Sequence, residues 1–345
     1  MKTKNLLLIF SVVLFGLGLL STTSCTKNDG GTDSGAGWKA LGSLDIANVY
    51  DLYIDKNGIL YAAGAFKNAA GKYYVAKWDG SKWSEVGTLN INGNVLAISG
   101  DASGNLYIAG LFTNSNNDEY VLKWNGSSWT DIGYTLGGSG YILTLCTDAS
   151  GNLYSGSSTQ VAKWSGSSWT KLNMTGFMHW VNSVFIDKSG NLIVGGGSYT
   201  AGTGGAVAKW NGNGWTELGS LNSYEQVYTL CNDPSGNLFA GGGFGNQSGY
   251  VVKWNGTSWT NLGLNANDMV NSICTDTKGN LYAGGSFNNS KNKFYVAKWD
   301  GTNWTDLGLD AYSGIKKLTH SNGKLYAAGS LAFILNSGHY IAVYN

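Results

Sequence analysis

The sequence predicts an all-β protein, folded as one closed β-propeller of seven four-stranded antiparallel blades. Three observations lead to this prediction. A segment with two tryptophans recurs along the chain, a glycine-containing turn motif recurs before it, and the two chain ends each supply part of one repeat. The composition agrees, because 52 glycines, 14 tryptophans and a single proline among 345 residues are typical of many short strands joined by tight turns.

The first repeated module is KWDGSKWSEVG, which begins at Lys77. Related copies begin at Lys123, Lys163, Lys209, Lys253 and Lys298. The second tryptophan of each copy stands at positions 83, 129, 169, 215, 259 and 304, so the steps are 46, 40, 46, 44 and 45 residues. This spacing is the period of a propeller blade. Four loop residues separate the two tryptophans, which places their rings opposite each other on one face of a hairpin.

The second module is a turn of the form D-x-x-G-N, followed by an apolar strand. Its aspartates are Asp55, Asp101, Asp148, Asp187, Asp233 and Asp276, and His320 is expected to replace the aspartate in the last copy. Glycine suits the left-handed position of a hairpin loop, and aspartate can cap the turn. Calcium is the alternative interpretation, but each turn offers one carboxylate and a calcium loop needs several oxygen ligands.

The two modules divide each repeat into four strands. In the third repeat, the sequence predicts strands over Ile142–Thr147, Asn152–Ser155, Val161–Trp164 and Trp169–Leu172, from the innermost to the outermost. Cys146, Cys231 and Cys274 precede the turn aspartates by two residues and are expected in the core of the innermost strands. We expect no disulfide among them, because strands of packed sheets lie roughly 10 Å apart.

The chain ends supply the missing strands of one blade. Residues 37–42 read as an outermost strand with no third strand before it. Tyr340–Asn345 reads as a third strand in which Tyr344 takes the place of the first tryptophan. We therefore expect a last blade built from both ends, which removes the open sheet edges that a ring would otherwise leave.

The N-terminal segment is distinct from the repeats. Lys2 and Lys4 precede an uncharged apolar run from Leu6 to Leu20, which is short for a membrane span and typical of a signal peptide. Ser21 to Cys25 resembles the lipobox of bacterial lipoproteins, although Thr22 stands where that family usually has leucine. The resemblance implies a signal peptide over residues 1–24 and lipidation of Cys25. The alternative is an ordinary cleaved signal with an incidental cysteine.

Residues 25–36 then form the lipidated cysteine and a polar, flexible linker, and residues 37–345 form the propeller. Lys27, Asn28 and Asp29 loosely resemble the export tag of surface lipoproteins in the Bacteroidetes. This resemblance implies an outer-membrane protein that faces the medium and contacts the membrane only through its lipid. We expect the end with the repeated turns to face the membrane, since the linker enters there.

The repeats also resemble a family. An apolar strand, D-x-x-G-N-L-Y-x-G-G, a polar loop and V-A-K-W-N-G-x-x-W resemble kelch-like propellers related to the central domain of galactose oxidase, over Gly37–Asn345. The resemblance implies the architecture and not an activity. The copper chemistry of galactose oxidase is not implied, because the matching tyrosine, histidine and cysteine constellation is missing.

The alternation of turns gives the ring two different ends. The D-x-x-G-N and N-G-x-x turns share one end, which we call the regular-turn end, and the other connections share the variable-loop end. Binding residues are often found on variable loops. The candidate ligand-binding patch there comprises His179, Trp180, Tyr224, Glu225, Asp268 and Tyr312. In the alternative interpretation, Trp180 only plugs the central channel.

These features favour a non-enzymatic binding or scaffold protein at the cell surface, with a glycan or protein partner. Only 12% of the residues are charged, the net charge is +1 and the basic residues are scattered, so nucleic acid is not an expected partner. We expect a monomer without a cofactor. One alternative is a lectin with a sugar site at each tryptophan pair. Another is an enzyme acting on polysaccharides, which would need an acid–base pair or a metal site.

Overall fold

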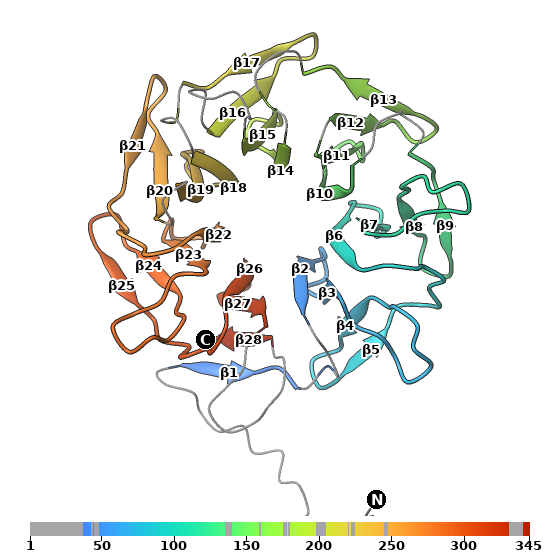
Figure 1. Cartoon of the computed structure of the whole chain (residues 1–345), viewed down its shortest axis with the longest axis horizontal. Coiled ribbons are helices and arrows are strands. Elements are labelled where there is room, and N and C mark those ends of the chain that lie inside the picture. The colour runs from blue at the N-terminus through green and yellow to red at the C-terminus, as the bar shows by residue number, and fades with distance from the viewer. Residues whose placement is uncertain are drawn as a thin grey trace, which may run out of the picture. The chain divides into compact units, whose positions relative to one another are not determined.

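The computed structural model describes residues 37–42, 44, 48–134, 140–158, 160–174, 178, 180–197, 205–219, 221, 225–244, 248–330 and 341–345. These residues form seven four-stranded antiparallel sheets arranged as blades of a ring (Figure 1). The predicted fold class is therefore confirmed. The signal peptide, Cys25 and the linker lie outside the described residues. No helix in those ranges has the length and apolar character needed to cross a membrane.

The two inner positions of each blade hold the longer strands, which carry most of the buried residues. The innermost strands are β2 (Val49–Ile54), β6 (Val95–Gly100), β10 (Ile142–Thr147), β14 (Trp180–Ile186), β18 (Glu225–Asn232), β22 (Val270–Thr275) and β26 (Ile315–Ser321). The second strands are β3 (Leu60–Gly64), β7 (Leu106–Gly110), β11 (Leu153–Ser157), β15 (Leu192–Gly197), β19 (Leu238–Phe244), β23 (Leu281–Gly285) and β27 (Lys324–Gly329).

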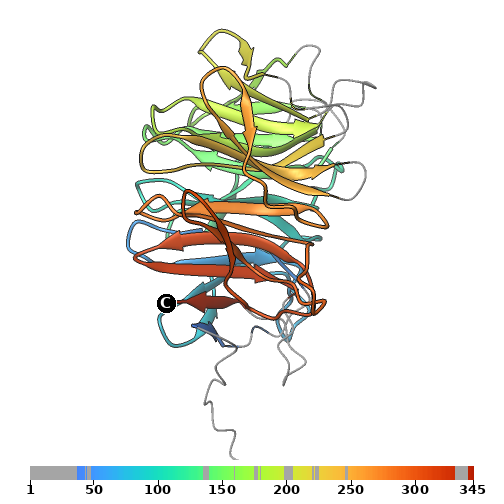
Figure 2. The same ribbon diagram turned by 90° about the vertical axis from the view of Figure 1, so that its left-hand side faces the viewer.

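The two outer positions hold the tryptophan hairpins. The third strands are β4 (Ala76–Trp78), β8 (Leu122–Trp124), β12 (Val161–Trp164), β16 (Gly205–Trp210), β20 (Gly249–Trp254), β24 (Ala297–Trp299) and β28 (Ala342–Tyr344). The outermost strands are β5 (Trp83–Glu85), β9 (Trp129–Asp131), β13 (Trp169–Leu172), β17 (Trp215–Glu217), β21 (Trp259–Asn261), β25 (Trp304–Asp306) and β1 (Trp38–Ala40). Blade 1 is β2–β5, and blade 7 is β26–β28 with β1. Seen from the side, the strands run between the two ends of the ring (Figure 2).

Blade 7 is built from both ends of the propeller, as predicted. β1 lies beside β28, with Trp38 opposite Tyr344 and Ala40 opposite Ala342 (Figure 1). Trp38 is fully buried, and its ring centroid lies 5.2 Å from that of Tyr344. The apolar side chain therefore holds a strand of only three residues in the sheet.

A second contact joins blades 7 and 1 at the channel. Lys317 on β26 forms an ion pair with Asp51 on β2 at 2.8 Å. Burial acts to lower the pKa of Lys317, but the Asp51 carboxylate raises it above the ordinary lysine value. Asp51 also accepts a hydrogen bond from the backbone N–H of Ile98 in blade 2. This carboxylate thus joins three consecutive blades at the inner edge of the ring.

Inner strands elsewhere are joined by hydroxyl groups at the same position. Thr229 accepts a hydrogen bond from the N–H of Ile273 at 3.1 Å, and Ser272 accepts one from the N–H of Leu318 at 2.9 Å. In each blade this position directly follows a β-bulge near the start of the innermost strand. The innermost strand has an unpaired edge, so these side chains satisfy backbone donors that a sheet neighbour would otherwise bind.

The outermost tryptophans join the blades at the rim. Trp124 and Trp129 are opposite each other in the hairpin, with ring centroids 5.4 Å apart. Trp129 also donates its indole N–H to the carbonyl of Val86 in the preceding blade. Equivalent bonds, at 2.5 to 3.2 Å, run from Trp38 to Leu307, Trp83 to Leu41, Trp169 to Ile132, Trp259 to Leu218 and Trp304 to Leu262. Among the described residues, the indole nitrogen of Trp215 alone in this set has no acceptor.

The three cysteines of the propeller lie on innermost strands, as predicted. Cys231 is buried and Cys146 and Cys274 are partly buried, and all three are free thiols. Each belongs to or packs against one of the apolar clusters between the blades. Burial raises the pKa of Cys274 to about 12, so this thiol is not a ready nucleophile at neutral pH.

The indole hydrogen bonds predict that replacing tryptophan by phenylalanine destabilises the fold to different extents at two equivalent positions. Trp129→Phe keeps an aromatic ring but removes the donor to Val86, and should lower the free energy of unfolding by about 1 kcal/mol more than Trp215→Phe, the matched variant at the position without an acceptor. Urea unfolding followed by far-ultraviolet circular dichroism measures both. Equal losses would show that the indole–carbonyl bond contributes nothing measurable.

Candidate functional site

The carboxylates of the regular-turn end are engaged in building the turns. Asp148 accepts hydrogen bonds from the backbone N–H groups of Ser150 and Asn152, from the Asn152 side chain and from the Tyr154 hydroxyl. The same arrangement recurs around Asp101 and Asp276. Within the described ranges, no group of three or more histidine, cysteine or acidic residues could hold a metal ion. The turn carboxylates therefore have a structural role.

The hydrogen bonds leave these carboxyl groups more acidic than usual. Burial acts to raise the pKa of Asp148, but the hydrogen bonds from Asn152, Tyr154 and Ser150 outweigh it and lower the pKa. Asp101 and Asp276 are lowered for the same reasons. In turn, the Asp148 carboxylate and burial raise the pKa of Tyr154, so the hydroxyl remains a hydrogen-bond donor.

The predicted place of His320 was wrong by one residue. In the last hairpin His320 pairs with Leu325 and Ser321 with Lys324, whereas in blade 1 Ile54 pairs with Leu60 ahead of the turn aspartate. Ser321 thus takes the aspartate position. The cause is a shorter turn: Asn322 and Gly323 both have positive φ, as a two-residue hairpin turn requires.

Large exposed apolar side chains gather at the variable-loop end. Among the described residues they are Leu111, Tyr141, Trp180, Met269 and Tyr312, with exposed fractions from 36% to 54%. Each lies where an innermost strand begins, where a second strand ends, or in a connection between blades at that end. The regular-turn end contributes none of them. Since apolar patches on one face often mark a binding surface, the variable-loop end is the candidate functional face.

Three of these side chains occupy one repeated position. We call it the mouth row: the residue directly before the fully buried valine or isoleucine near the start of each innermost strand. In chain order its members are Asn48, Asn94, Tyr141, Trp180, Gln226, Met269 and Gly314. Tyr141, Trp180 and Met269 make the row apolar in blades 3, 4 and 6. Asparagine or glycine holds the position in blades 1, 2 and 7.

Glycines position the mouth row against the neighbouring blade. Residues at or near the ends of the second strands lie under the row: a side chain at Gly243 in blade 5 would collide with Met269 of blade 6, and one at Gly197 in blade 4 would collide with Gln226 of blade 5. Leu111 directly follows the second strand of blade 2 and by this repeat faces Tyr141 of blade 3. The row therefore places one residue of each blade along the inner edge of the ring at the variable-loop end.

The predicted patch is distributed along this border. Trp180 begins β14 and is 39% exposed. Asp268 lies in the connection that leads into blade 6, and its carboxylate accepts a hydrogen bond from the backbone N–H of Met269 at 2.6 Å. Tyr312 lies between blades 6 and 7, with Lys293 Nζ 3.1 Å from its ring centroid.

Glu225 begins β18, while His179 and Tyr224 lie outside the described residues. The described members thus occupy separate blade junctions rather than one compact cluster, and the patch stays a prediction. Sequence reasoning missed Tyr141 and Leu111. The signal for Tyr141 was its position seven residues before the turn aspartate, which it shares with Trp180 and Met269.

Comparisons with known proteins bear on the fold. No protein-family model matches the sequence, and no curated protein is detectably similar to it. Among solved structures, virginiamycin B lyase from Staphylococcus aureus with quinupristin is similar, with 10% identity, a TM-score of 0.67, and coverage of 89% of this chain and 98% of that chain.

Two further solved structures are similar over most of this chain. The extracellular domain of a hybrid two-component system from B. thetaiotaomicron has 13% identity and a TM-score of 0.65, with 90% of this chain and 41% of that chain covered. YCF48 bound to a D1 peptide has 13% identity and a TM-score of 0.61, with 90% of this chain and 99% of that chain covered. Identities this low show the propeller fold alone. The kelch-like relationship stays a prediction.

The turn carboxylates predict a pH dependence of stability. A lowered pKa in the folded state means that Asp148 stabilises the fold above its unfolded pKa of about 3.9, and that this contribution is lost as the pH falls through the lowered value. Urea midpoints measured from pH 6 down to pH 2 should therefore decline less steeply in Asp148→Asn than in the unchanged protein. Tyr154→Phe, which removes one of the donors, should lie between them. Identical slopes for all three proteins would contradict the prediction.

Proposed function

We propose that this chain is a lipid-anchored binding or scaffold propeller at the outer surface of the cell, which holds a protein partner on the mouth row and performs no catalysis. The observation that carries the proposal is that, in the part of the chain that the structure describes, the large exposed apolar side chains lie at one end of the ring. A surface of this kind is usually covered by a partner. The other end is occupied by turns whose polar groups bond one another.

The chemistry of the mouth row favours a protein over a glycan. Met269 of the row and Leu111 beside it are apolar without a ring, and methionine adapts to apolar partners of different shapes. Tyr141 and Trp180 are aromatic and belong to the residue types that dominate protein interfaces. The complex of YCF48 with a peptide and the extracellular domains of sensor proteins show that other propellers of this shape serve in binding or at the cell exterior. A glycan stacked on Tyr141 and Trp180 is the second candidate.

The absence of catalysis is part of the proposal and rests on the side chains near the mouth. The carboxylate of Asp268 in the patch accepts a hydrogen bond from its own loop, and the carboxylate of Asp51 at the inner edge of the ring is paired with Lys317. Neither is arranged as an acid facing a base across a substrate. The likeness to virginiamycin B lyase is at 10% identity and supports the fold alone.

A lectin with one site per tryptophan pair has less support. In most blades the outer tryptophan donates its indole N–H to a neighbouring backbone carbonyl. These rings are partly buried and hold the blades together. The repetition of these pairs is therefore explained by the fold, without a sugar site at each of them.

Site-specific photo-crosslinking on intact cells tests the mouth row. A photoreactive residue at Tyr141 should give a defined adduct, and one at exposed Ser127 on the regular-turn end should not. Adding Trp180→Ala to the protein with the photoreactive residue at position 141 should reduce the amount of adduct several-fold, because an apolar contact with the partner is lost. Mass spectrometry of the crosslinked peptide identifies a protein partner by a second peptide attached at position 141, and periodate sensitivity of the added mass identifies a glycan. Equal adducts from both positions, or none from Tyr141, would defeat the proposal.

The lipid anchor is tested separately. Cys25→Ser should abolish labelling by radioactive palmitate and move the protein from the membrane fraction to the soluble fraction, since the thiol that carries the lipid is gone. Ser24→Ala, which keeps a small residue before the cysteine, is the matched control and should remain labelled. Continued membrane association of the Cys25→Ser protein would rule out anchoring through Cys25.

A further inference from the structure

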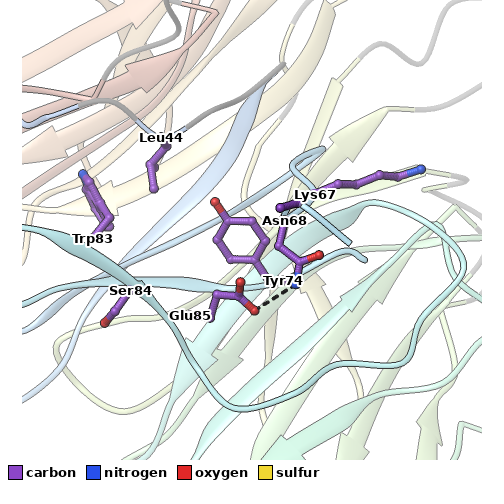
Figure 3. Close-up of a pocket in the computed structure, with 8 residues that line it drawn as sticks. Leu44, Lys67, Asn68, Tyr74, Trp83, Ser84 and Glu85 are labelled. Carbon is purple, nitrogen blue, oxygen red and sulfur yellow. Dashed lines mark hydrogen bonds between the residues drawn. The ribbon is translucent and has the colours of Figure 1, made fainter. Parts of the chain in front are cut away.

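A cavity of about 610 Å³ opens on the outer flank of blade 1, beside the closing blade. This volume lies within the range of about 300–1,000 Å³ typical of small-molecule sites. Its lining comes from the β1–β2 connection, the loop after β3, and strand β5 (Figure 3): Leu44, Lys67, Asn68, Ala69, Tyr74, Trp83, Ser84 and Glu85. The cavity is separate from the mouth row, since β5 is the outermost strand.

An amide and a carboxylate meet at one side of this cavity. Asn68 donates its side-chain N–H to Glu85 Oε2 at 3.2 Å (Figure 3). Asn68 Oδ1 accepts the backbone N–H groups of Ala70 and Lys72 at 3.1 and 3.0 Å. These two bonds fix which way the amide faces, because the oxygen is held by the loop and the nitrogen must point to Glu85. The pair is therefore set in place before any ligand arrives.

Two aromatic rings border the same cavity and are also fixed. Tyr74 packs edge-on against the buried Phe66, with ring centroids 4.8 Å apart. Trp83 donates its indole N–H to Leu41 and packs against Trp78 at 5.3 Å. In Figure 3 the Tyr74 ring lies between the Asn68–Glu85 pair and Leu44. A ligand here would meet apolar ring surface and a directed acceptor together.

Blade 6 contains an equivalent amide–carboxylate pair, but its carboxylate accepts a second hydrogen bond from the backbone. Asn289 donates to Asp306 Oδ2 at 3.1 Å, but Asp306 Oδ1 also accepts the N–H of Gly308 at 2.7 Å. Glu85 has one more methylene group, and among the described residues only Asn68 donates a hydrogen bond to it. Its second carboxylate oxygen thus keeps its capacity to accept. In blade 1 this carboxylate lines the cavity described above.

We propose that the blade 1 cavity binds a neutral pyranose unit of a glycan. Vicinal sugar hydroxyls would donate to Glu85 and accept from the remaining N–H of Asn68, while the apolar face of the sugar ring would lie on Tyr74 and Trp83. The carboxylate disfavours uronic and other acidic sugars by like-charge repulsion. Lys67 does not offset that repulsion, because its Nζ lies over the Tyr73 ring at 4.5 Å and the side chain extends away from the pair (Figure 3).

Saturation-transfer NMR tests this inference on the full-length protein in a detergent without a sugar headgroup. The probes are glucose, galactose, mannose, xylose and their disaccharides, with glucuronic acid as the charged probe. We expect saturable binding of at least one neutral probe in the millimolar range, and none of glucuronic acid. Glu85→Gln should weaken that binding at least about tenfold, as expected for loss of a hydrogen bond to a charged group.

Asp306→Asn in blade 6 is the matched control and should bind the neutral probe as the unchanged protein does. Thermal unfolding of each variant shows that the propeller is intact. The inference is overturned if no neutral probe binds, if glucuronic acid binds as well, or if the two substitutions weaken binding equally. Trp180→Ala should leave the titration unchanged. The sugar experiment therefore succeeds or fails independently of the partner proposed for the mouth row.

Discussion

The hydrogen bond from an outer tryptophan to the preceding blade is the constraint on which this ring depends. Trp129 belongs to the outermost strand of blade 2, yet the indole N–H bonds the carbonyl of Val86 in blade 1. In the six blades where this bond is present, the indole ring is turned toward the neighbouring blade and its aromatic partner in the hairpin packs against it. Trp215 in blade 4 keeps the packing without such a bond to any described residue. At the inner edge, Asp51, Thr229 and Ser272 perform the same task with polar side chains. The blades are thus joined at both radii, and the apolar clusters fill the space between.

Joining the blades in this way divides the ring into a constant and a variable part. The turn aspartates and the tryptophan hairpins use most of their polar groups within the fold, so substitution there is costly. At the variable-loop end, fewer side chains have polar groups that are used within the fold. Met269 lies over a glycine, Gly243, whereas by the same repeat Tyr141 lies over Leu111, so the row differs from blade to blade together with the residue beneath it. The mouth row is apolar in blades 3, 4 and 6, polar in blades 1, 2 and 5, and glycine in blade 7, and this asymmetry is what a single partner would meet.

Spacing alone predicted the number of blades, the order of strands and the closure of the ring, because the paired tryptophans mark the same hairpin in every repeat. Three features could not be predicted from the spacing, for physical reasons. The acceptor of Trp129 lies 43 residues earlier in the chain, so the bond depends on how neighbouring blades stack. The register of His320 depended on a turn that is one residue shorter. The Asn68–Glu85 pair joins a loop to a strand 17 residues later, and only the backbone bonds to Asn68 direct it there.

The pairing of Trp38 with Tyr344 has a consequence for how the ring could be cut. Gly37 precedes Trp38 and Asn345 follows Tyr344 at this antiparallel pairing, so a short peptide could join them. A break could then be moved to an exposed turn in another blade, such as the one around Gly126, where an added Cβ would meet no neighbouring atom. The circularly permuted ring would keep every interblade bond. The positions of the chain ends could therefore be changed without changing the fold of the ring.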